Sequence, residues 1–159
     1  MPLTQHIYTC ALSFMADRSY SADITQEVML RLWDNRKELA KIDNLKAYAL
    51  CITRNICLDT IKKHKPIYDE AQTHRNEEVT DPLKQIETQD TATIVRQIIE
   101  TLPPTQKEVI QLREIHELEY EEIAEITGLG LNNIRVLLSR ARSKVKDILI
   151  KKYQFSQYE

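Results

Sequence analysis

The sequence LEYEEIAEITGLGLNNIRVLLSRARSKVK, Leu118–Lys146, has the pattern of two helices around a tight turn. The chain contains two glycines, Gly128 and Gly130, and both lie inside this stretch. Because glycine adopts positive φ at little steric cost, the pair predicts the position of the turn. A short helix, a glycine turn and a longer helix form the layout of a DNA-binding helix-turn-helix.

The helix after the turn separates into two faces when its residues are placed at 100° intervals. The apolar face, which we expect to join the core, holds Leu131, Ile134, Leu138, Ala141, Val145, Ile148 and Leu149. The opposite face holds Asn132, Asn133, Arg135, Ser139, Arg140, Ser143 and Lys146. Val136 lies near the middle of this polar face, where it has no core to join. Such a side chain can contact a thymine methyl group in a major groove.

Residues 131–152 contain seven cations and one acid, Asp147. A basic helix by itself is more often an ordinary amphipathic helix with a solvated face. Here the glycine turn and the acid-rich helix before it favour DNA contact, because they set the geometry that a groove-reading helix needs.

The length of 159 residues allows one domain or two small ones. No apolar run is long enough to span a bilayer and no signal peptide is visible, so we expect the cytoplasm. The formal net charge is −2, but its distribution is uneven. Lys and Arg outnumber Asp and Glu by ten to seven in residues 1–65, whereas acids outnumber cations by seven to two in residues 66–90. The chain is therefore expected to bind DNA weakly alone and to need a partner.

The N-terminal third predicts three helices. Residues 3–16 form the first, and Ser21 or Asp23 is expected to cap a second that runs to about Lys41. The apolar arc of the second helix is Ile24, Val28, Met29 and Leu32. Leu30 lies in the centre of its polar side, which fits an isolated exposed leucine and a protein-binding patch equally well.

Asn44 is expected to cap a long third helix that reaches about Lys65 and ends before Pro66. Its inward residues are expected to be Leu45, Ala49, Ile52 and Ile56. Residues 67–90 are acidic and lack periodicity, which predicts a linker.

Helical periodicity returns at Thr91, and Pro103-Pro104 separates two further helices. Their predicted inward residues are Ile94, Val95, Ile98, Ile99, Leu102, Val109, Leu112 and Ile115. No strand pattern is present. We therefore predict an all-α fold with two small helical domains, residues 1–66 and 91–159, joined by the flexible acidic linker 67–90.

The cysteines Cys10, Cys51 and Cys57 are odd in number and lack CxxC spacing, so neither a disulfide framework nor a zinc site is indicated. We interpret them as core or half-buried residues, with a redox role as the minor alternative. The four histidines form no HExxH motif, and no phosphate-binding glycine loop or GxSxG is present. We expect no metal, no cofactor, no small-molecule substrate and no enzymatic activity.

Three fragments, in order, resemble a bacterial RNA polymerase sigma factor of the extracytoplasmic-function (ECF) type. ADITQEVMLRLW (Ala22–Trp33) and NLKAYALCITRNICLDTIKK (Asn44–Lys63) resemble the family's region 2. LPPTQKEVIQLREIHELEYEEIAEITGLGLNNIRVLLSRAR (Leu102–Arg142) resembles region 4. The resemblance covers nearly the whole chain, and the linker between the fragments has a suitable length.

The resemblance implies a protein that binds RNA polymerase core and directs it to promoters, with region 2 reading and melting the −10 element and region 4 reading the −35 element. The positions implied to contact the polymerase clamp helices are Asp23, Gln26, Glu27, Leu30 and Trp33. Those implied to face the −10 strand are Asn44, Leu45, Lys46, Tyr48, Arg54, Asn55, Leu58 and Lys62. Those implied to read the −35 element are Asn132, Asn133, Arg135, Val136, Ser139 and Arg140. An anti-sigma partner, membrane-linked or not, is also implied.

Several positions depart from the family pattern. Glu119 and Gly130 stand where Ser or Thr commonly caps a helix, so we expect weakened caps. Glu117 stands where glycine is usual, so the loop there is expected to differ. The chain also begins close to its first helix, which suggests a shortened N-terminus.

The competing interpretation is a stand-alone helix-turn-helix regulator. Such proteins bind as symmetric dimers, and no dimerisation helix is evident in the sequence. Residues 1–65 would also be left without a role.

Overall fold

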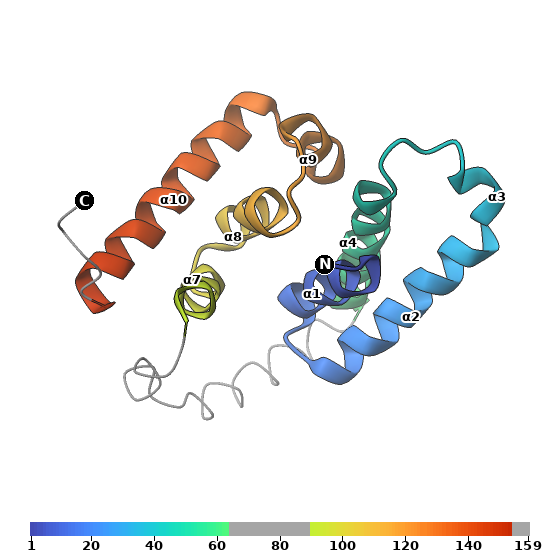
Figure 1. Ribbon diagram of the computed structural model, residues 1–159, viewed down its shortest axis with the longest axis horizontal. Coiled ribbons are helices and arrows are strands. Elements are labelled where there is room, and N and C mark those ends of the chain that lie inside the picture. Colours follow the sequence, from blue (N-terminus) through green and yellow to red (C-terminus); the bar gives the residue numbers. More distant parts are fainter. Residues whose placement is uncertain (64–89, 154–159) are drawn as a thin grey trace. The chain divides into compact units, whose positions relative to one another are not determined.

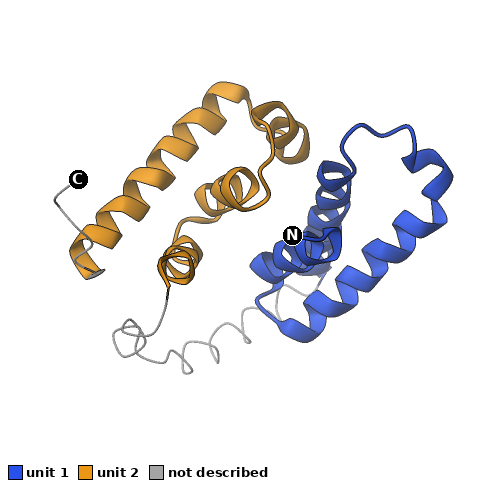
Figure 2. Cartoon of the chain, viewed as in Figure 1, with its two compact units in different colours: residues 1–77 blue, residues 78–159 orange. Residues whose placement is uncertain are grey.

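The computed structural model describes residues 1–63 and 90–153. Every element in these two ranges is helical, which confirms the predicted all-α fold (Figure 1). The chain divides into two compact units, residues 1–77 and 78–159 (Figure 2). The predicted linker lies outside the described residues except for Asp90, so its boundaries remain a prediction. No helix in the described ranges has both the length and the apolar character needed to cross a bilayer.

The first unit consists of α1 (Leu3–Met15), α2 (Arg18–Asp34), the short α3 (Arg36–Leu39) and α4 (Leu45–Lys63). Helix α1 packs against both α2 and α4, and α2 also contacts α4. Their shared core contains Ile7, Ala11, Met15, Ile24, Val28, Leu32, Ala49, Ile56 and Cys57. Three long helices around one apolar core therefore position the outward faces of α2 and α4.

Helix α2 begins earlier than the sequence suggested. Asp17 is its N-cap, with Oδ1 accepting a hydrogen bond from the Tyr20 backbone N–H at 2.9 Å. Ser21 is buried, and its hydroxyl donates to the Asp17 carbonyl at 2.6 Å. The prediction that Ser21 or Asp23 caps this helix is therefore wrong, because the polar residues before Ser21 already form its first turn.

Helix α2 also ends earlier than predicted, at Asp34 rather than near Lys41. The Asn35 side chain donates to the Arg31 carbonyl at 3.0 Å, and the Asn35 backbone N–H donates to the same oxygen. These two hydrogen bonds to the Arg31 carbonyl end the helix before α3. On the inner face, Thr25 is buried, whereas Met29, predicted to lie inward, is exposed.

Asn44 caps α4 as predicted, since its Oδ1 accepts from the Ala47 backbone N–H at 3.1 Å. Ala49 and Ile56 are buried as expected. The inward prediction for Leu45 is wrong, because this first residue of α4 is exposed. The core side of the helix instead includes Leu50.

The second unit consists of α7 (Thr91–Glu100), α8 (Pro104–Ile110), a π-helical turn η2 (Gln111–Ile115), α9 (Tyr120–Thr127) and α10 (Leu131–Tyr153). Helix α10 contacts α7, α8 and α9 and so spans the unit. The buried apolar residues of this unit are Ile94, Ile98, Ile99, Leu102, Val109, Ile110, Leu112, Leu118, Ile123, Ile126, Ile134, Leu138, Ala141 and Val145. Val95 and Ile115, predicted to lie inward, are half-buried.

The turn between α9 and α10 uses its two glycines differently. Gly128 has φ +75° and ends α9, with its N–H donating to the Ala124 carbonyl at 2.9 Å. Gly130 does not have positive φ; its carbonyl accepts from Ile134 N–H at 3.0 Å at the start of α10. The tight turn is therefore confirmed, but only Gly128 needs the freedom of glycine.

Two departures from the family pattern have local explanations. Glu117 has φ +56°, so a position where glycine is usual does take the left-handed conformation, here with a side chain present. At the start of α9, Glu122 Oε1 accepts from the Glu119 backbone N–H at 3.0 Å in a capping-box arrangement. The Glu122 carboxylate therefore satisfies the N-cap N–H, and the expected weakening of the cap stays a prediction.

Candidate functional site

The outward face at the start of α10 carries the predicted −35 readers. All six are exposed, namely Asn132, Asn133, Arg135, Val136, Ser139 and Arg140. Val136 is 45% exposed in the middle of this face. Leu131, which was expected to be core, is exposed because it lies at the first turn of the helix. The opposite side is buried at Ile134, so the angular assignment of the two faces holds.

Arg135 is partly ordered by its neighbours. Its Nη1 donates to Asn132 Oδ1 at 3.1 Å, and its guanidinium carbon lies 5.9 Å from the centroid of the Tyr120 ring. Arg140 makes no ion pair with another residue in the described ranges. The two arginines therefore differ in how far their side chains are fixed before DNA is present.

The Arg142 side chain makes a contact between two elements of the second unit. Its Nε and Nη2 both donate to Glu114 Oε1, with the Nε bond at 2.9 Å. This pairing raises the pKa of Arg142, chiefly through the hydrogen bond to Glu114. The bond joins η2 to α10, and spacing in the sequence could not reveal it because the partners are 28 residues apart.

One face of α4 groups most of the predicted −10 residues. At 100° per residue, Tyr48, Arg54, Asn55, Leu58 and Lys62 fall within one arc, away from the buried side of the helix. Tyr48 and Leu58 are large exposed hydrophobic residues on this arc. An exposed aromatic ring on the same helix face as cationic side chains is a combination that can bind single-stranded bases and their phosphates.

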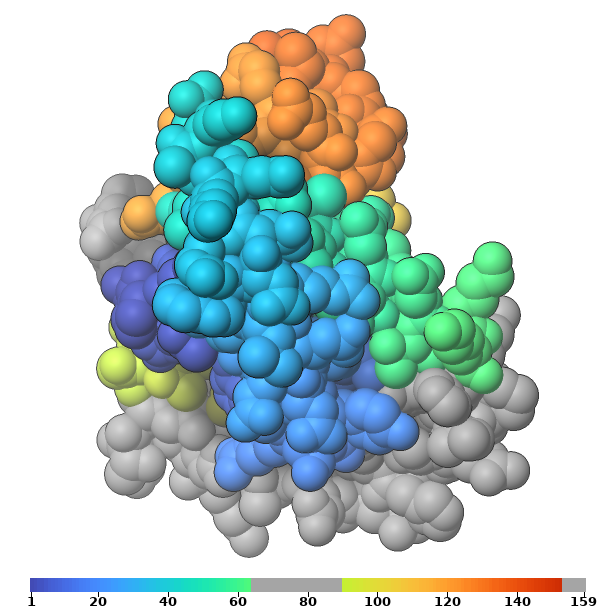
Figure 3. Space-filling view, turned by 90° about the vertical axis from the view of Figure 1, so that its right-hand side faces the viewer, coloured from blue at the N-terminus to red at the C-terminus, as the bar shows by residue number. Residues whose placement is uncertain are grey.

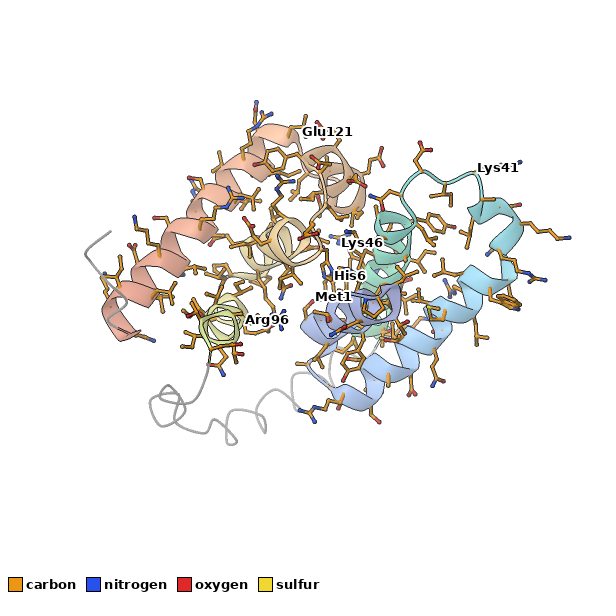
Figure 4. All side chains as sticks on the ribbon, in the orientation of Figure 1. Met1, His6, Lys41, Lys46, Arg96 and Glu121 are labelled. Carbon is orange, nitrogen blue, oxygen red and sulfur yellow. The ribbon has the colours of Figure 1, made fainter. Side chains whose placement is uncertain are left out.

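The remaining −10 candidates lie at the start of α4, near the connection that carries Lys41 (Figure 4). Leu45 is exposed, and Asn44 already uses its side-chain oxygen to cap the helix. At 100° per residue, Lys46 lies on the side of α4 that also carries the buried Thr53. It therefore does not share the face of Tyr48 and Lys62.

The outward face of α2 carries the predicted polymerase-binding residues. All of them are exposed, namely Asp23, Gln26, Glu27, Leu30 and Trp33. Leu30 is 63% exposed and Trp33 is 64% exposed. Helices α2 and α3 form much of the near surface, in blue to cyan, in Figure 3. A solvent-facing leucine and tryptophan on one helix match the anchors of protein interfaces.

Charged neighbours frame this apolar pair. Glu27 forms an ion pair with Arg31 at 2.8 Å, one helical turn along. The Arg36 guanidinium carbon lies 4.4 Å from the Trp33 ring centroid, and its Nη1 donates to the Trp33 carbonyl at 3.0 Å. One face of the indole is therefore covered by Arg36 while much of the residue stays in solvent.

The three cysteines have the burial that was expected of them as core or half-buried residues. Cys10 and Cys57 are buried and Cys51 is half-buried, and none forms a disulfide. Burial raises the pKa of the Cys57 thiol to about 12, so this thiol stays protonated at neutral pH. Within residues 1–63 and 90–153, no three His, Cys, Asp or Glu side chains are grouped to hold a metal ion.

Comparison with protein-family models gives two matches, in the order of the resembling fragments. Residues 3–67 match the model described as Sigma-70 region 2, and residues 92–145 match the model described as Sigma-70, region 4. The two matches are separated by residues 68–91. They include the faces of α2, α4 and α10 described above.

Curated relatives are sigma factors with modest identity. The chain is 28% identical over 152 residues to the "Probable RNA polymerase sigma factor RfaY" of Xanthomonas campestris, covering 90% of this chain and 37% of that protein. It is 27% identical over 137 residues to RNA polymerase sigma factor SigV of Bacillus subtilis, covering 86% and 80%. A match to SigI of Mycobacterium tuberculosis covers 51% of that protein, so the chain spans about half the length or less of some relatives.

Among solved structures, the sigma factor RpoE of Bartonella quintana, crystallised with the anti-sigma factor NepR, has the same fold. The TM-score is 0.70 at 20% identity, with 94% of this chain and 93% of that chain covered. At this identity the match establishes the fold.

Proposed function

Because the chain belongs to the sigma-70 family, in its ECF group, we propose that it binds bacterial RNA polymerase core and directs promoter-specific transcription initiation. The observation that supports this most strongly is the outward face of α10. There an exposed valine lies among exposed arginines on the second helix of a helix-turn-helix. We assign no catalytic activity to the chain, and we place it in the cytoplasm, where its polymerase partner works.

The second unit is assigned to the −35 element. Arg135 and Arg140 contact phosphate or guanine, and Val136 contacts a thymine methyl group. Short polar side chains near the start of α10 complete this −35 surface, namely those of Asn132, Asn133 and Ser139. This arrangement fits a recognition helix that contacts base edges with its N-terminal residues.

The first unit is assigned to the −10 element and to the polymerase. On α4, Tyr48 supplies a ring for an unstacked base, and Arg54 and Lys62 attract phosphate. On α2, Leu30 and Trp33 anchor the polymerase clamp helices, with Asp23, Gln26 and Glu27 as the polar surround. These residues complete the −10 surface: Asn44, Leu45, Lys46, Asn55 and Leu58.

The two functional domains are assigned to residues 1–66 and 91–159, and the acidic residues 67–90 are assigned as the linker between them. An anti-sigma factor is the expected regulator, as for the Bartonella quintana protein, which was crystallised with one. Such a factor would control access to the polymerase-binding surface.

Run-off transcription on a pool of genomic fragments tests the proposal. Purified core polymerase is assayed with and without this protein. Protein-dependent transcripts that share an upstream motif are the expected result, and they give the promoter sequence. Absence of core binding would overturn the proposal and favour a stand-alone helix-turn-helix regulator.

A further inference from the structure

Tyr120 is the first residue of α9, the helix that also carries the Glu121 labelled in Figure 4. Its half-buried ring has arginines from two other elements near it. The guanidinium carbon of Arg113, from η2, lies 4.9 Å from the ring centroid. That of Arg135, from α10, lies 5.9 Å from it. Both distances are within the roughly 6 Å over which a cation is attracted to an aromatic ring. One ring therefore joins the turn before α9 to the outward face of α10.

The two arginines differ in how their charge is compensated. Arg113 lies 3.8 Å from a carboxylate oxygen of Glu119, and its Nη1 donates to the Leu118 carbonyl at 2.8 Å. Arg135 has no ion pair with any residue in the described ranges. Its contacts are the Tyr120 ring and the Asn132 amide oxygen, and both groups are neutral. Arg135 is therefore held in place by neutral groups, and no carboxylate in the described ranges pairs with it.

We propose that Tyr120 is a positioning residue for Arg135, which it holds, together with Asn132, in the orientation that reads the −35 element. The inference rests on the proposed role of α10 in promoter recognition. A planar guanidinium that is already oriented loses less side-chain entropy when it forms paired hydrogen bonds to guanine. DNA that covers the site also removes water from the ring, which strengthens the attraction between ring and cation.

The test measures base preference of the full chain bound to core polymerase, on promoters randomised across the −35 element. Arg135→Ala first identifies the base pair that Arg135 reads. Tyr120→Leu is expected to lower discrimination at that same base pair about three-fold. Tyr120→Phe keeps the ring and is expected to keep the discrimination. Equal losses at every position of the element would overturn the proposal, because they would indicate general damage to the unit.

A double-mutant cycle separates positioning from independent contributions. In an Arg135→Ala background, Tyr120→Leu is expected to cause no further loss, because the group it positions is gone. In an Arg140→Ala background the same change is expected to retain its full three-fold effect. A loss of discrimination of the same size from Tyr120→Leu in both backgrounds would overturn the proposal.

Failure of this inference is distinguishable from failure of the proposed function. If Arg135→Ala changes no base preference, promoter reading by this face of α10 fails, and the role of Tyr120 fails with it. If Arg135→Ala relaxes one position but Tyr120→Leu does not, only the role of Tyr120 is overturned. Thermal unfolding of each variant shows whether the second unit is still folded.

Discussion

Helices α2 and α10 both leave apolar side chains in solvent, but the charges around them differ. Acids and arginines are mixed around Leu30 and Trp33, whereas the outward face at the start of α10 carries arginines without acids. On α2, Leu30 and Trp33 lie on a face that also carries Asp23 and Glu27. On α10, Val136 lies between Arg135 and Arg140. Acids repel DNA and are compatible with a protein partner, whereas arginines attract phosphate and guanine. The charge around an exposed apolar residue therefore indicates which kind of partner covers it.

The largest expected effect is on the α2 surface. Leu30→Asp should weaken binding to core polymerase by about 2 kcal/mol or more, since truncating or charging an interface anchor has an effect of this size. Because Leu30 is 63% exposed, the free energy of unfolding should change little. Affinity for core and far-ultraviolet circular dichroism are measured on the same sample.

Val136→Asp is the matched control for that prediction, since it places the same acid at the exposed apolar position of α10. It should leave core affinity unchanged and weaken promoter binding. If Leu30→Asp instead reduces helicity as much as it reduces binding, then Leu30 contributes to the fold and the comparison between the two helices fails.

On α10, Arg140→Ala should weaken −35 recognition by about 1–3 kcal/mol, because a bidentate or phosphate contact is lost. Footprinting of the upstream promoter by the polymerase complex measures the effect. Arg96→Ala is the control, because Arg96 is an exposed arginine of the same unit that lies on α7 and not on the outward face at the start of α10. Equal effects of the two changes would mean that charge alone, rather than the α10 face, determines binding.

The first unit should also respond to high pH, through Cys57. Its folded pKa of about 12 exceeds the value near 9 of a free thiol, so the folded state retains the proton that the unfolded state releases. Stability is therefore unaffected below pH 9 and falls between pH 9 and 12 by about 1.4 kcal/mol per pH unit. Urea unfolding at pH 8, 9 and 10 measures this slope.

Cys57→Ala is the comparison for the pH slope. The Cys57→Ala variant should be less stable at every pH, because a buried side chain is shortened. The contribution of the Cys57 thiol to the pH dependence of the free energy of unfolding should be absent from this variant. The second unit contains no cysteine, so its unfolding lacks this contribution. An unchanged slope in the variant would show that other groups, such as tyrosines, cause the alkaline loss.

The smallest expected effects are on stability, at residues with positive φ. Glu117→Gly should stabilise it by about 1 kcal/mol, because the left-handed backbone strains a residue with a side chain. Gly128→Ala should destabilise it by a similar amount, for the same reason in reverse. Thermal unfolding measures both, and Ala16→Gly, at φ +51°, repeats the first change in the other unit. A destabilising Glu117→Gly would show that the glutamate side chain makes a contribution that outweighs the strain.

The period of 3.6 residues predicted much of the inward and outward faces of the long helices, but it assigned Met29, Leu45 and Leu131 to the core, and these are exposed. Leu30 and Val136 were identified as outward from angle alone, and both are exposed. Helix ends were less predictable, because several polar residues compete for one cap. Asp17, rather than Ser21 or Asp23, caps α2, since the helix gains a turn by starting earlier.

Long-range contacts could not be predicted, because they depend on how helices cross. The bond from Arg142 to Glu114 engages one arginine of α10 with a residue of η2. The grouping of Arg113 and Arg135 around Tyr120 joins three separate elements. The sequence thus indicated which face of α10 is outward, but not which of its arginines are already engaged.

The most direct test of the account is the affinity of core polymerase for Leu30→Asp and Arg140→Ala, measured side by side without DNA. The account predicts about a 30-fold loss for Leu30→Asp, which corresponds to about 2 kcal/mol, and a change of less than about two-fold for Arg140→Ala. Similar losses for both variants, or a loss confined to Arg140→Ala, would contradict the assignment of α2 to the polymerase and α10 to the promoter.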